Sequence, residues 1–414
     1  MSESAMPISE PLEIGARVRM IRRRRGLGLE TASGLAGISK SYLSLLENGK
    51  RQLDRRGLVE DLARALGCSV TDITGSSRTP IHRRAADEAN ALRDIRSVLN
   101  DHGADEIPDV HPRPVNQLAA WADQANESCS QAEYSTIAHD AANVLAELQK
   151  QAFTANRAER EEAFTAAVTT CFVTGVVASR LGNVDLAATA ARRGFDLAYQ
   201  YDDLGLRGFA RWYWAVELIS SAARKRARSV LNTGIAELAP SVNLTGSRTL
   251  PAEMTGMLHL QLARTAARQY DSDQAHAHLA EARQLADRIG ERNGMRQHFG
   301  PTNVAVWRLA IGIELSEGRR AYDDTMSTNL DVRVLASRER TSSLHFDLAR
   351  ALTQEDTTGD TEAVRHLDAA DRIAPQRIRP DPIAHDLVHR LSRRSTRRSW
   401  ELTSLKNRFG AGQD

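Results

Sequence analysis

Three alanines at a constant interval constrain the fold of most of this 414-residue chain. Ala187, Ala275 and Ala363 are each 88 residues apart, inside alanine-rich segments whose apolar residues recur with helical periodicity. Small residues at matching positions let antiparallel helices pack closely. An interval of this length accommodates two helical hairpins of about 44 residues each. The pattern therefore predicts an all-α region of repeated hairpins, with weaker repeats near Ala227 and Gly318.

The spacing around two of these alanines is the same. Ala263 and Ala351 each precede the repeated alanine by 12 residues, and a further alanine follows it by seven. Pro375 comes shortly after the last of these positions and suits the end of a second helix. The positions resemble tetratricopeptide (TPR) repeats with lengthened helices, over residues 134–392. The resemblance implies an α-solenoid whose groove binds extended peptides or partner helices; a generic alanine-rich bundle is the alternative.

A separate segment near the N-terminus has the pattern of a tight turn followed by a short helix. Gly37 can adopt the positive φ of the turn, and the Ser39 hydroxyl can cap the helix. Leu43 and Leu46 share one apolar face, and Asn48-Gly49 ends the helix. This is the pattern of the second half of a helix-turn-helix. The outward residues are then candidates for reading base edges in the DNA major groove: Lys40, Ser41, Ser44 and Leu45.

Charge is concentrated in the same region. Residues 14–56 hold eleven Lys and Arg against three acidic residues, whereas the whole chain has a net charge of +2. Such a local excess is typical of a nucleic-acid interface, although a small bundle with a merely solvated basic face is the alternative. Residues 372–414 are also basic, so the centre is net acidic and is expected to serve something other than DNA. The basic tail Arg390 to Trp400 could contact nucleic acid or form a solvated capping helix.

Five short helices are expected over residues 13–75, and their order resembles the Cro/phage-repressor class, the XRE family. The resemblance implies a structural pair between Arg22 and Glu47. It also implies contacts to the DNA backbone from Tyr42, Asn48, Lys50, Arg51 and Arg55, with Arg55 near the minor groove. Gly28 and Leu29 depart from the family, which has a capping Ser or Thr followed by a phosphate-binding Gln. The second helix is therefore expected to have a weaker cap and one contact fewer.

Aromatic residues make up only 5% of the chain, yet four lie close together between Phe209 and Trp214. Trp212 and Trp214 cannot share one helix face, so at least one is expected in the core. Asparagine is a poor helix former unless it has a hydrogen-bonding task, which a bound peptide backbone would provide. The candidate ligand groove therefore consists of Asn183, Phe209, Trp212, Tyr213, Asn232 and Asn303, with a cap or a solvated residue as the alternative for each asparagine.

The sequence contains no pattern for catalysis, a cofactor or a metal. It lacks a glycine-rich phosphate loop, a His-Glu-x-x-His motif and a nucleophile elbow. Cys68, Cys129 and Cys171 are widely spaced, which suits reduced thiols in a cytoplasmic protein. No apolar run approaches the ~20 residues of a membrane span, and no secretory signal is recognised. We expect no enzyme activity, no cofactor and no membrane partner.

The sequence as a whole predicts an all-α chain: a five-helix DNA-binding domain (13–75), a linker with one helix (76–114) and a TPR-like solenoid (115–409). This combination resembles the RRNPP class of bacterial regulators and actinobacterial helix-turn-helix–TPR regulators. It implies a cytoplasmic, homodimeric transcription regulator of double-stranded DNA, switched by a signalling peptide as in quorum sensing. A scaffold whose repeats bind a partner protein, and a ligand-independent repressor that dimerises through its repeats, remain alternatives.

Overall fold

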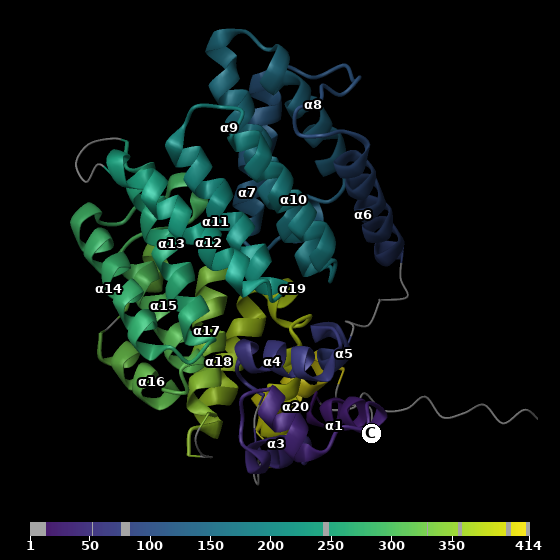
Figure 1. Cartoon of the computed structure of the whole chain (residues 1–414), viewed down its shortest axis with the longest axis vertical. Coiled ribbons are helices and arrows are strands. Elements are labelled where there is room, and N and C mark those ends of the chain that lie inside the picture. Colours follow the sequence, from purple (N-terminus) through teal and green to yellow (C-terminus); the bar gives the residue numbers. More distant parts are fainter. Residues whose placement is uncertain are drawn as a thin grey trace, which may run out of the picture. The chain divides into compact units, whose positions relative to one another are not determined.

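The chain forms two compact units, one of which contains both ends of the sequence. The computed structural model describes residues 14–51, 53–75, 83–242, 248–328, 330–354, 358–394 and 399–410. Unit 1 comprises Met1–Ser77 together with Asp381–Asp414, and unit 2 comprises Arg78–Pro380. Every regular element of the described residues is helical, so the all-α prediction is confirmed (Figure 1). The predicted limit of the repeats, residue 409, differs from this division, which falls after Pro380.

Unit 1 contains the five short helices predicted from the N-terminal sequence and two more from the C-terminus. They are α1 (Ile14–Arg24), α2 (Leu29–Leu35), α3 (Lys40–Glu47), α4 (Arg56–Leu66), α5 (Val70–Thr74), α20 (Pro382–Arg394) and α21 (Trp400–Arg408). Val18, Leu43, Leu58 and Leu62 are fully buried in the core that the N-terminal helices share. Gly37 has a φ of +69° in the turn between α2 and α3, a conformation that side chains other than glycine rarely adopt.

Unit 2 begins with α6 (Arg83–Asp101), the helix expected in the linker; linker residues 76–82 lie outside the described part. Helical hairpins follow along the chain. Their helices are α7 (Val115–Ser130), α8 (Ala141–Thr154), α9 (Arg157–Arg180), α10 (Val184–Ala198), α11 (Leu204–Ser220), α12 (Arg224–Leu238), α13 (Leu250–Ala267), α14 (Ser272–Ile289), α15 (Pro301–Glu314), α16 (Gly318–Ser327), α17 (Arg338–Leu352) and α18 (Asp360–Ile373). Four 3₁₀ segments and α19 (Pro375–Ile378) complete the described elements, among them η1 (Tyr134–Thr136) and η3 (Gly294–Arg296).

The repeated alanines occupy equivalent places in this series. Ala187, Ala275 and Ala363 lie near the beginnings of α10, α14 and α18, and each is 0% exposed. Each of these helices packs against the helix before it. The two positions predicted for weaker repeats lie in the hairpins between them. Ala227 is in α12, and Gly318 is the first residue of α16. The 88-residue interval therefore corresponds to two hairpins. At each repeated position a small alanine side chain lets the second helix of a hairpin pack closely against the first.

Helix α9 is long and apolar enough to span a membrane by length and composition alone. Its most apolar window has a mean hydropathy of 1.4, and 78% of that window is buried inside the structure. It packs against α7, α8 and α10 within unit 2. The apolar character of α9 is accordingly that of a helix packed largely among other helices.

The first and last hairpins of unit 2 contact each other. Helix α7, from the first hairpin, contacts α17 from the last one as well as its neighbour α9. The Ser337 hydroxyl donates to the Ser130 carbonyl at 3.0 Å, and the Gln131 amide donates to the Ala336 carbonyl at 2.9 Å. The first and last hairpins of the series are therefore joined by direct contacts and hydrogen bonds.

Candidate nucleic-acid interface

Helix α3 presents one polar face to solvent and one apolar face to the core of unit 1. It begins at Ser39, whose hydroxyl accepts a hydrogen bond from the Tyr42 backbone N–H at 3.1 Å. Leu43 and Leu46 are buried, which fixes the rotation of the helix about its axis. The predicted base-reading residues then lie on the solvent side: Lys40, Ser41 and Leu45 are exposed and Ser44 is half-buried. This arrangement suits a helix that enters the major groove.

Lys40 already has a partner in the absence of DNA. Its ammonium group lies 3.6 Å from the Glu30 carboxylate of α2, and both side chains are largely exposed. Exposed pairs of this kind contribute about 0–1 kcal/mol. The pair can therefore be exchanged for a base or a phosphate at little cost.

The residues after α3 form a polar turn that suits contacts to phosphate. Gly49 has a φ of +67°, and the Asn48 amide donates to the Ser44 carbonyl at 2.7 Å, closing the helix end. Lys50 and Arg51 are exposed, and the Arg51 guanidinium lies 5.4 Å from the centroid of the half-buried Tyr42 ring. Four of the five predicted backbone-contacting residues thus lie together at this end of α3.

Arg55 does not share that environment. It is the residue before α4 and is only 7% exposed, so its burial argues against the direct contact with DNA that the sequence predicted. The predicted weakness at the start of α2 is present, because Gly28 precedes that helix and provides no side-chain hydrogen bond to it.

Arg22 and Glu47, the pair implied by the resemblance, join α1 to the last residue of α3. Nε and Nη2 of Arg22 donate to the two Glu47 oxygens at 2.6 and 2.7 Å, and Nη1 donates to the Leu27 carbonyl at 2.8 Å. Both side chains are buried. The pair is therefore a structural clamp on the recognition helix and has no free surface to offer DNA.

The candidate ligand residues of unit 2 separate into two groups. Phe209, Trp212, Tyr213 and Asn303 are all at most 5% exposed. The first three surround Phe172 of α9, with ring centroids 4.9 to 6.1 Å from its own. Trp214 is also buried, with its ring centroid 4.5 Å from that of Phe195, so the expectation that at least one of Trp212 and Trp214 lies in the core is confirmed. The aromatic cluster is thus part of the enclosed core.

The other two candidates lie elsewhere. Asn183 is half-buried in the turn before α10, where it donates to the Leu181 carbonyl and accepts from Arg96 at 3.4 Å. Asn232 is exposed on α12. These two positions match the alternative interpretation, a turn residue and a solvated residue.

Several buried polar atoms of unit 2 find no hydrogen-bond partner among the described residues. Five of these atoms lie on the first helices of successive hairpins: Thr174 Oγ1 (α9), Trp212 Nε1 (α11), Gln261 Oε1 (α13), Asn303 Oδ1 and Trp307 Nε1 (both α15). An unmade hydrogen bond of this kind costs about 1–3 kcal/mol. Periodicity shows which helix faces are buried but not which buried atoms lack a partner, so the sequence could identify only Trp212 and Asn303.

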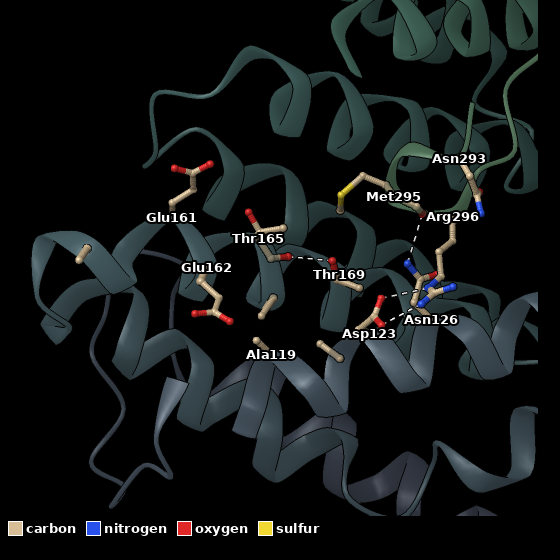
Figure 2. Close-up of a pocket in the computed structure, with 13 residues that line it drawn as sticks. Ala119, Asp123, Asn126, Glu161, Glu162, Thr165, Thr169, Asn293, Met295 and Arg296 are labelled. Atoms are coloured by element: carbon tan, nitrogen blue, oxygen red, sulfur yellow. Dashed lines mark hydrogen bonds and ion pairs between the residues drawn. The ribbon is translucent and has the colours of Figure 1, made fainter. Parts of the chain in front are cut away.

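An open hollow of about 690 Å³ lies between α7, α9 and η3. Figure 2 shows Glu161, Glu162 and Thr165 of α9 on one side and Arg296 of η3 on the other. Arg296 donates to both oxygens of Asp123, at 3.0 and 2.8 Å, and Asn126 donates to the Met295 carbonyl at 3.2 Å. Met295 and Arg296 have positive φ values of 50° and 56°. No sequence pattern indicates this turn beside the hollow, because neither Met295 nor Arg296 is a glycine.

The geometry of unit 1 defines a helix-turn-helix DNA-binding protein. Residues 13–74 match the family described as a helix-turn-helix domain. Two curated relatives from Sinorhizobium fredii are HTH-type transcriptional regulators described as uncharacterized: y4mF, 32% identical over 74 residues, and y4dJ, 38% identical over 72 residues. The matches cover 18% and 17% of this chain but 96% and 92% of those relatives. The chain therefore belongs to the HTH-type transcriptional regulators, through its N-terminal domain.

A solved structure is also similar over a larger part of the chain. It is Bacillus thuringiensis PlcR in complex with the peptide PapR7 and DNA, at 12% identity and a TM-score of 0.27, covering 66% of this chain and 94% of that one. At that TM-score the similarity supports no conclusion about the present fold or its ligand. Among the described residues no group of three or more His, Cys, Asp or Glu side chains could hold a metal ion.

Proposed function

We propose that this DNA-binding transcription regulator acts in the cytoplasm as a homodimer and reads its operator with α3. The carrying observation is the exposure of Lys40, Ser41 and Leu45 on a helix held in place by the Arg22–Glu47 pair. Side chains of these types can bond base edges or meet a thymine methyl group. A rigid helix fixes their positions, so that a wrong base costs about 1–3 kcal/mol.

The dimer follows from the size of the reading surface. One small head buries too little DNA for tight specific binding, whereas two heads read half-sites about one helical turn apart. Sedimentation of the full-length protein with and without an operator fragment tests this step. A single chain on each operator would contradict it.

We further infer that unit 2 binds a peptide or another ligand with exposed amide groups. The support is the set of buried polar atoms on α9, α11, α13 and α15 that have no partner among the described residues. The amide groups of a peptide would satisfy such atoms. Entry would require the contacts between α7 and α17 to open, so the ligand would favour a different shape of unit 2 and thereby alter DNA binding.

One alternative has an observation in its favour. Because the first and last hairpins contact each other, the described structure is also compatible with a ligand-independent repressor that uses unit 2 only to dimerise. The third possibility is a scaffold that binds a partner protein on the outer surface of unit 2 and leaves the contacts between α7 and α17 in place. Pull-down from lysate by the full-length protein separates them: a stoichiometric protein partner favours the scaffold, and a co-purified small peptide favours ligand control.

The first experiment is selection of genomic DNA fragments by the full-length protein, beside a Lys40→Ala/Ser41→Ala variant. We expect an inverted-repeat motif that the variant no longer prefers. The matched control is Lys225→Ala/Ser229→Ala, an exposed pair of the same residue types on α12. An unchanged motif in the Lys40→Ala/Ser41→Ala variant would show that α3 is not the reading helix.

The ligand is tested by thermal unfolding of the full-length protein in the presence of peptide fractions from culture fluid. Ligand at 100 times its dissociation constant stabilises the folded state by about 2.7 kcal/mol. The stabilisation should be weaker in a Gln261→Leu variant, which removes an unpartnered oxygen and keeps the side-chain volume. A fraction that stabilises both proteins equally does not bind at these atoms.

A further inference from the structure

Elements from the two ends of unit 2 are tied together by one shared carboxylate. Glu339, in the first turn of α17, accepts a hydrogen bond from Arg180 Nη2 of α9 at 3.1 Å and from Arg377 Nε of α19 at 2.9 Å. The ring of Tyr134, in η1, has its centroid 5.4 Å from the Arg180 guanidinium. Four segments that are distant in the sequence therefore meet around the negative charge of Glu339.

A third arginine, Arg340, follows Glu339 in α17 but takes no part in these bonds. Its side chain forms no hydrogen bond or ion pair with any residue of the described part of the chain. Its electrostatic neighbours are Glu339, Arg377, Arg180 and Tyr134, so the attraction of one carboxylate is opposed by repulsion from two arginines. Arg340 is half-buried, and burial lowers its pKa. The guanidinium thus occupies an unfavourable place without completing the network.

Two further donors of this cluster also lack an acceptor. Nη1 of Arg377 and the hydroxyl of Tyr134 are buried, and neither finds a hydrogen-bond partner among the described residues. Glu217, the other acid near the cluster, faces Arg180 and is not among the electrostatic neighbours of Arg340. Three side chains that can donate hydrogen bonds therefore gather where the described residues provide no further acceptor.

A solvated arginine would account for Arg340 alone, as it does for Arg338, whose side chain is 48% exposed. It does not account for the Tyr134 hydroxyl or for Nη1 of Arg377, because both atoms are buried. His298 also interacts with Arg340, but burial lowers the pKa of His298 to about 4, so its ring is neutral at ordinary pH. The group that suits this place carries a negative charge and several acceptor lone pairs.

We propose that Arg340, Arg377 and Tyr134 bind an oxyanion of the ligand, either a carboxylate or a phosphoryl group. A planar guanidinium can meet such a group with two parallel hydrogen bonds, and the half-buried position of Arg340 leaves it accessible. The negative charge would offset the repulsion among the arginines, so it favours the bound state. This inference deepens the proposed ligand binding by unit 2 and rests on it, because it names a chemical group of the ligand.

Thermal unfolding of the full-length protein tests the site with two probes, inorganic phosphate and acetate, at an ionic strength kept constant with sodium chloride. Either anion at about ten times its dissociation constant should raise the melting temperature of the wild type by roughly 2–4 °C. Arg340→Gln should lose most of this saturable gain. Arg340→Lys keeps the charge but not the planar donors, so it should retain a part. A gain with acetate assigns a carboxylate, and a gain with phosphate alone assigns a phosphoryl group.

The same variants separate a binding site from a structural network. Without added anion, Arg340→Gln should melt no lower than the wild type, because it removes a cation that two arginines repel. Tyr134→Phe removes only an unpartnered hydroxyl, so it should reduce the gain with anion and cause no loss of stability without it. Arg365→Gln, at an exposed position on α18, is the control and should behave as the wild type.

Equal gains in the wild type and in Arg340→Gln are what a general salt effect produces, and they would overturn this inference alone. A lower melting temperature of Arg340→Gln without anion would do the same, since Arg340 would then be a structural residue. Failure of the proposed function would be seen elsewhere: no fraction of culture-fluid peptides would stabilise the wild type, and no DNA motif would be enriched.

Discussion

Arg22 and Glu47 are 25 residues apart in sequence and are joined by two parallel hydrogen bonds of 2.6 and 2.7 Å inside unit 1. The contact raises the pKa of Arg22 because the Glu47 carboxylate hydrogen-bonds its charged form. Both side chains are shielded from water, so the pair resembles a buried salt bridge and not a surface one. It sets where the recognition helix ends relative to α1.

Removing Glu47 should loosen α3 without touching any exposed residue. Glu47→Ala leaves the Arg22 guanidinium buried without its partner, a loss of about 3–5 kcal/mol. Hydrogen–deuterium exchange of α1 and α3 in the full-length protein should accelerate, while exchange in unit 2 stays unchanged. Arg23→Ala, an exposed neighbour of Arg22, is the control. Equal exchange in Glu47→Ala and wild type would contradict the clamp.

Leu45 should contribute to sequence preference but not to salt dependence. Its side chain is 41% exposed on the reading face of α3, where it can pack on a thymine methyl group. Leu45→Ser should relax discrimination at one operator position by about 1–3 kcal/mol and leave the salt slope unchanged. Met326→Ser, at a 52% exposed position of unit 2, should change neither quantity. Titration of operators substituted one base at a time provides the measurement.

Glu217→Gln should stabilise unit 2 at alkaline pH. Burial raises the pKa of Glu217 to about 7, against the effect of Tyr213 and the positive charges of Arg180 and Arg264. The unfolded chain releases the Glu217 proton above the ordinary pKa of 4.5, whereas the folded state keeps it up to about pH 7. The free energy of unfolding therefore falls as the pH rises from 4.5 to about 7. Above about pH 7 the loss in the free energy of unfolding is on the order of 3 kcal/mol.

Melting temperatures at about pH 8 and about pH 5 measure this effect. The gain from Glu217→Gln should be larger at the higher pH, because the variant has no carboxylate to ionise. Glu161→Gln, at an exposed position on α9, is the control. A gain that does not depend on pH would show that the Glu217 carboxylate is not the cause.

Two interhelical histidine pairs should make unit 2 sensitive to acid. Nδ1 of His259 lies 3.1 Å from Nδ1 of His278, and Nδ1 of His345 lies 3.0 Å from Nδ1 of His366. Burial, followed by the charge of the neighbouring imidazole, lowers the pKa of His259 and of His366 to about 4. These residues stay neutral in the folded protein, whereas in the unfolded chain they bind a proton below pH 6.5. The free energy of unfolding therefore decreases as the pH falls from 6.5 towards 4.

Replacing His366 with Gln should therefore flatten the fall in melting temperature between about pH 7 and pH 5. His139→Gln, at an exposed position, should leave the curve parallel to that of the wild type. Parallel curves for both variants would show that the pair does not govern acid stability.

Local patterns in the sequence predicted most of the fold. The Ser39 cap, the Gly37 turn and the spacing of Ala187, Ala275 and Ala363 each act within a few residues or within one hairpin, so the sequence displays them directly. The place of α20 depends on contacts such as Arg56 with Asp381, 325 residues apart, which no periodicity records. Whether Asn183 and Asn232 face a groove depends on how the hairpins curve, and that is settled by packing across the whole series.

The division of the chain also makes unit 2 a loop inserted into the fold of unit 1. For a flexible loop the entropy lost on closure grows only with the logarithm of its length, so doubling that length costs about 0.6 kcal/mol more. The gain or loss of a hairpin over evolutionary time would therefore carry little penalty for the DNA-binding fold, so the number of repeats is free to change.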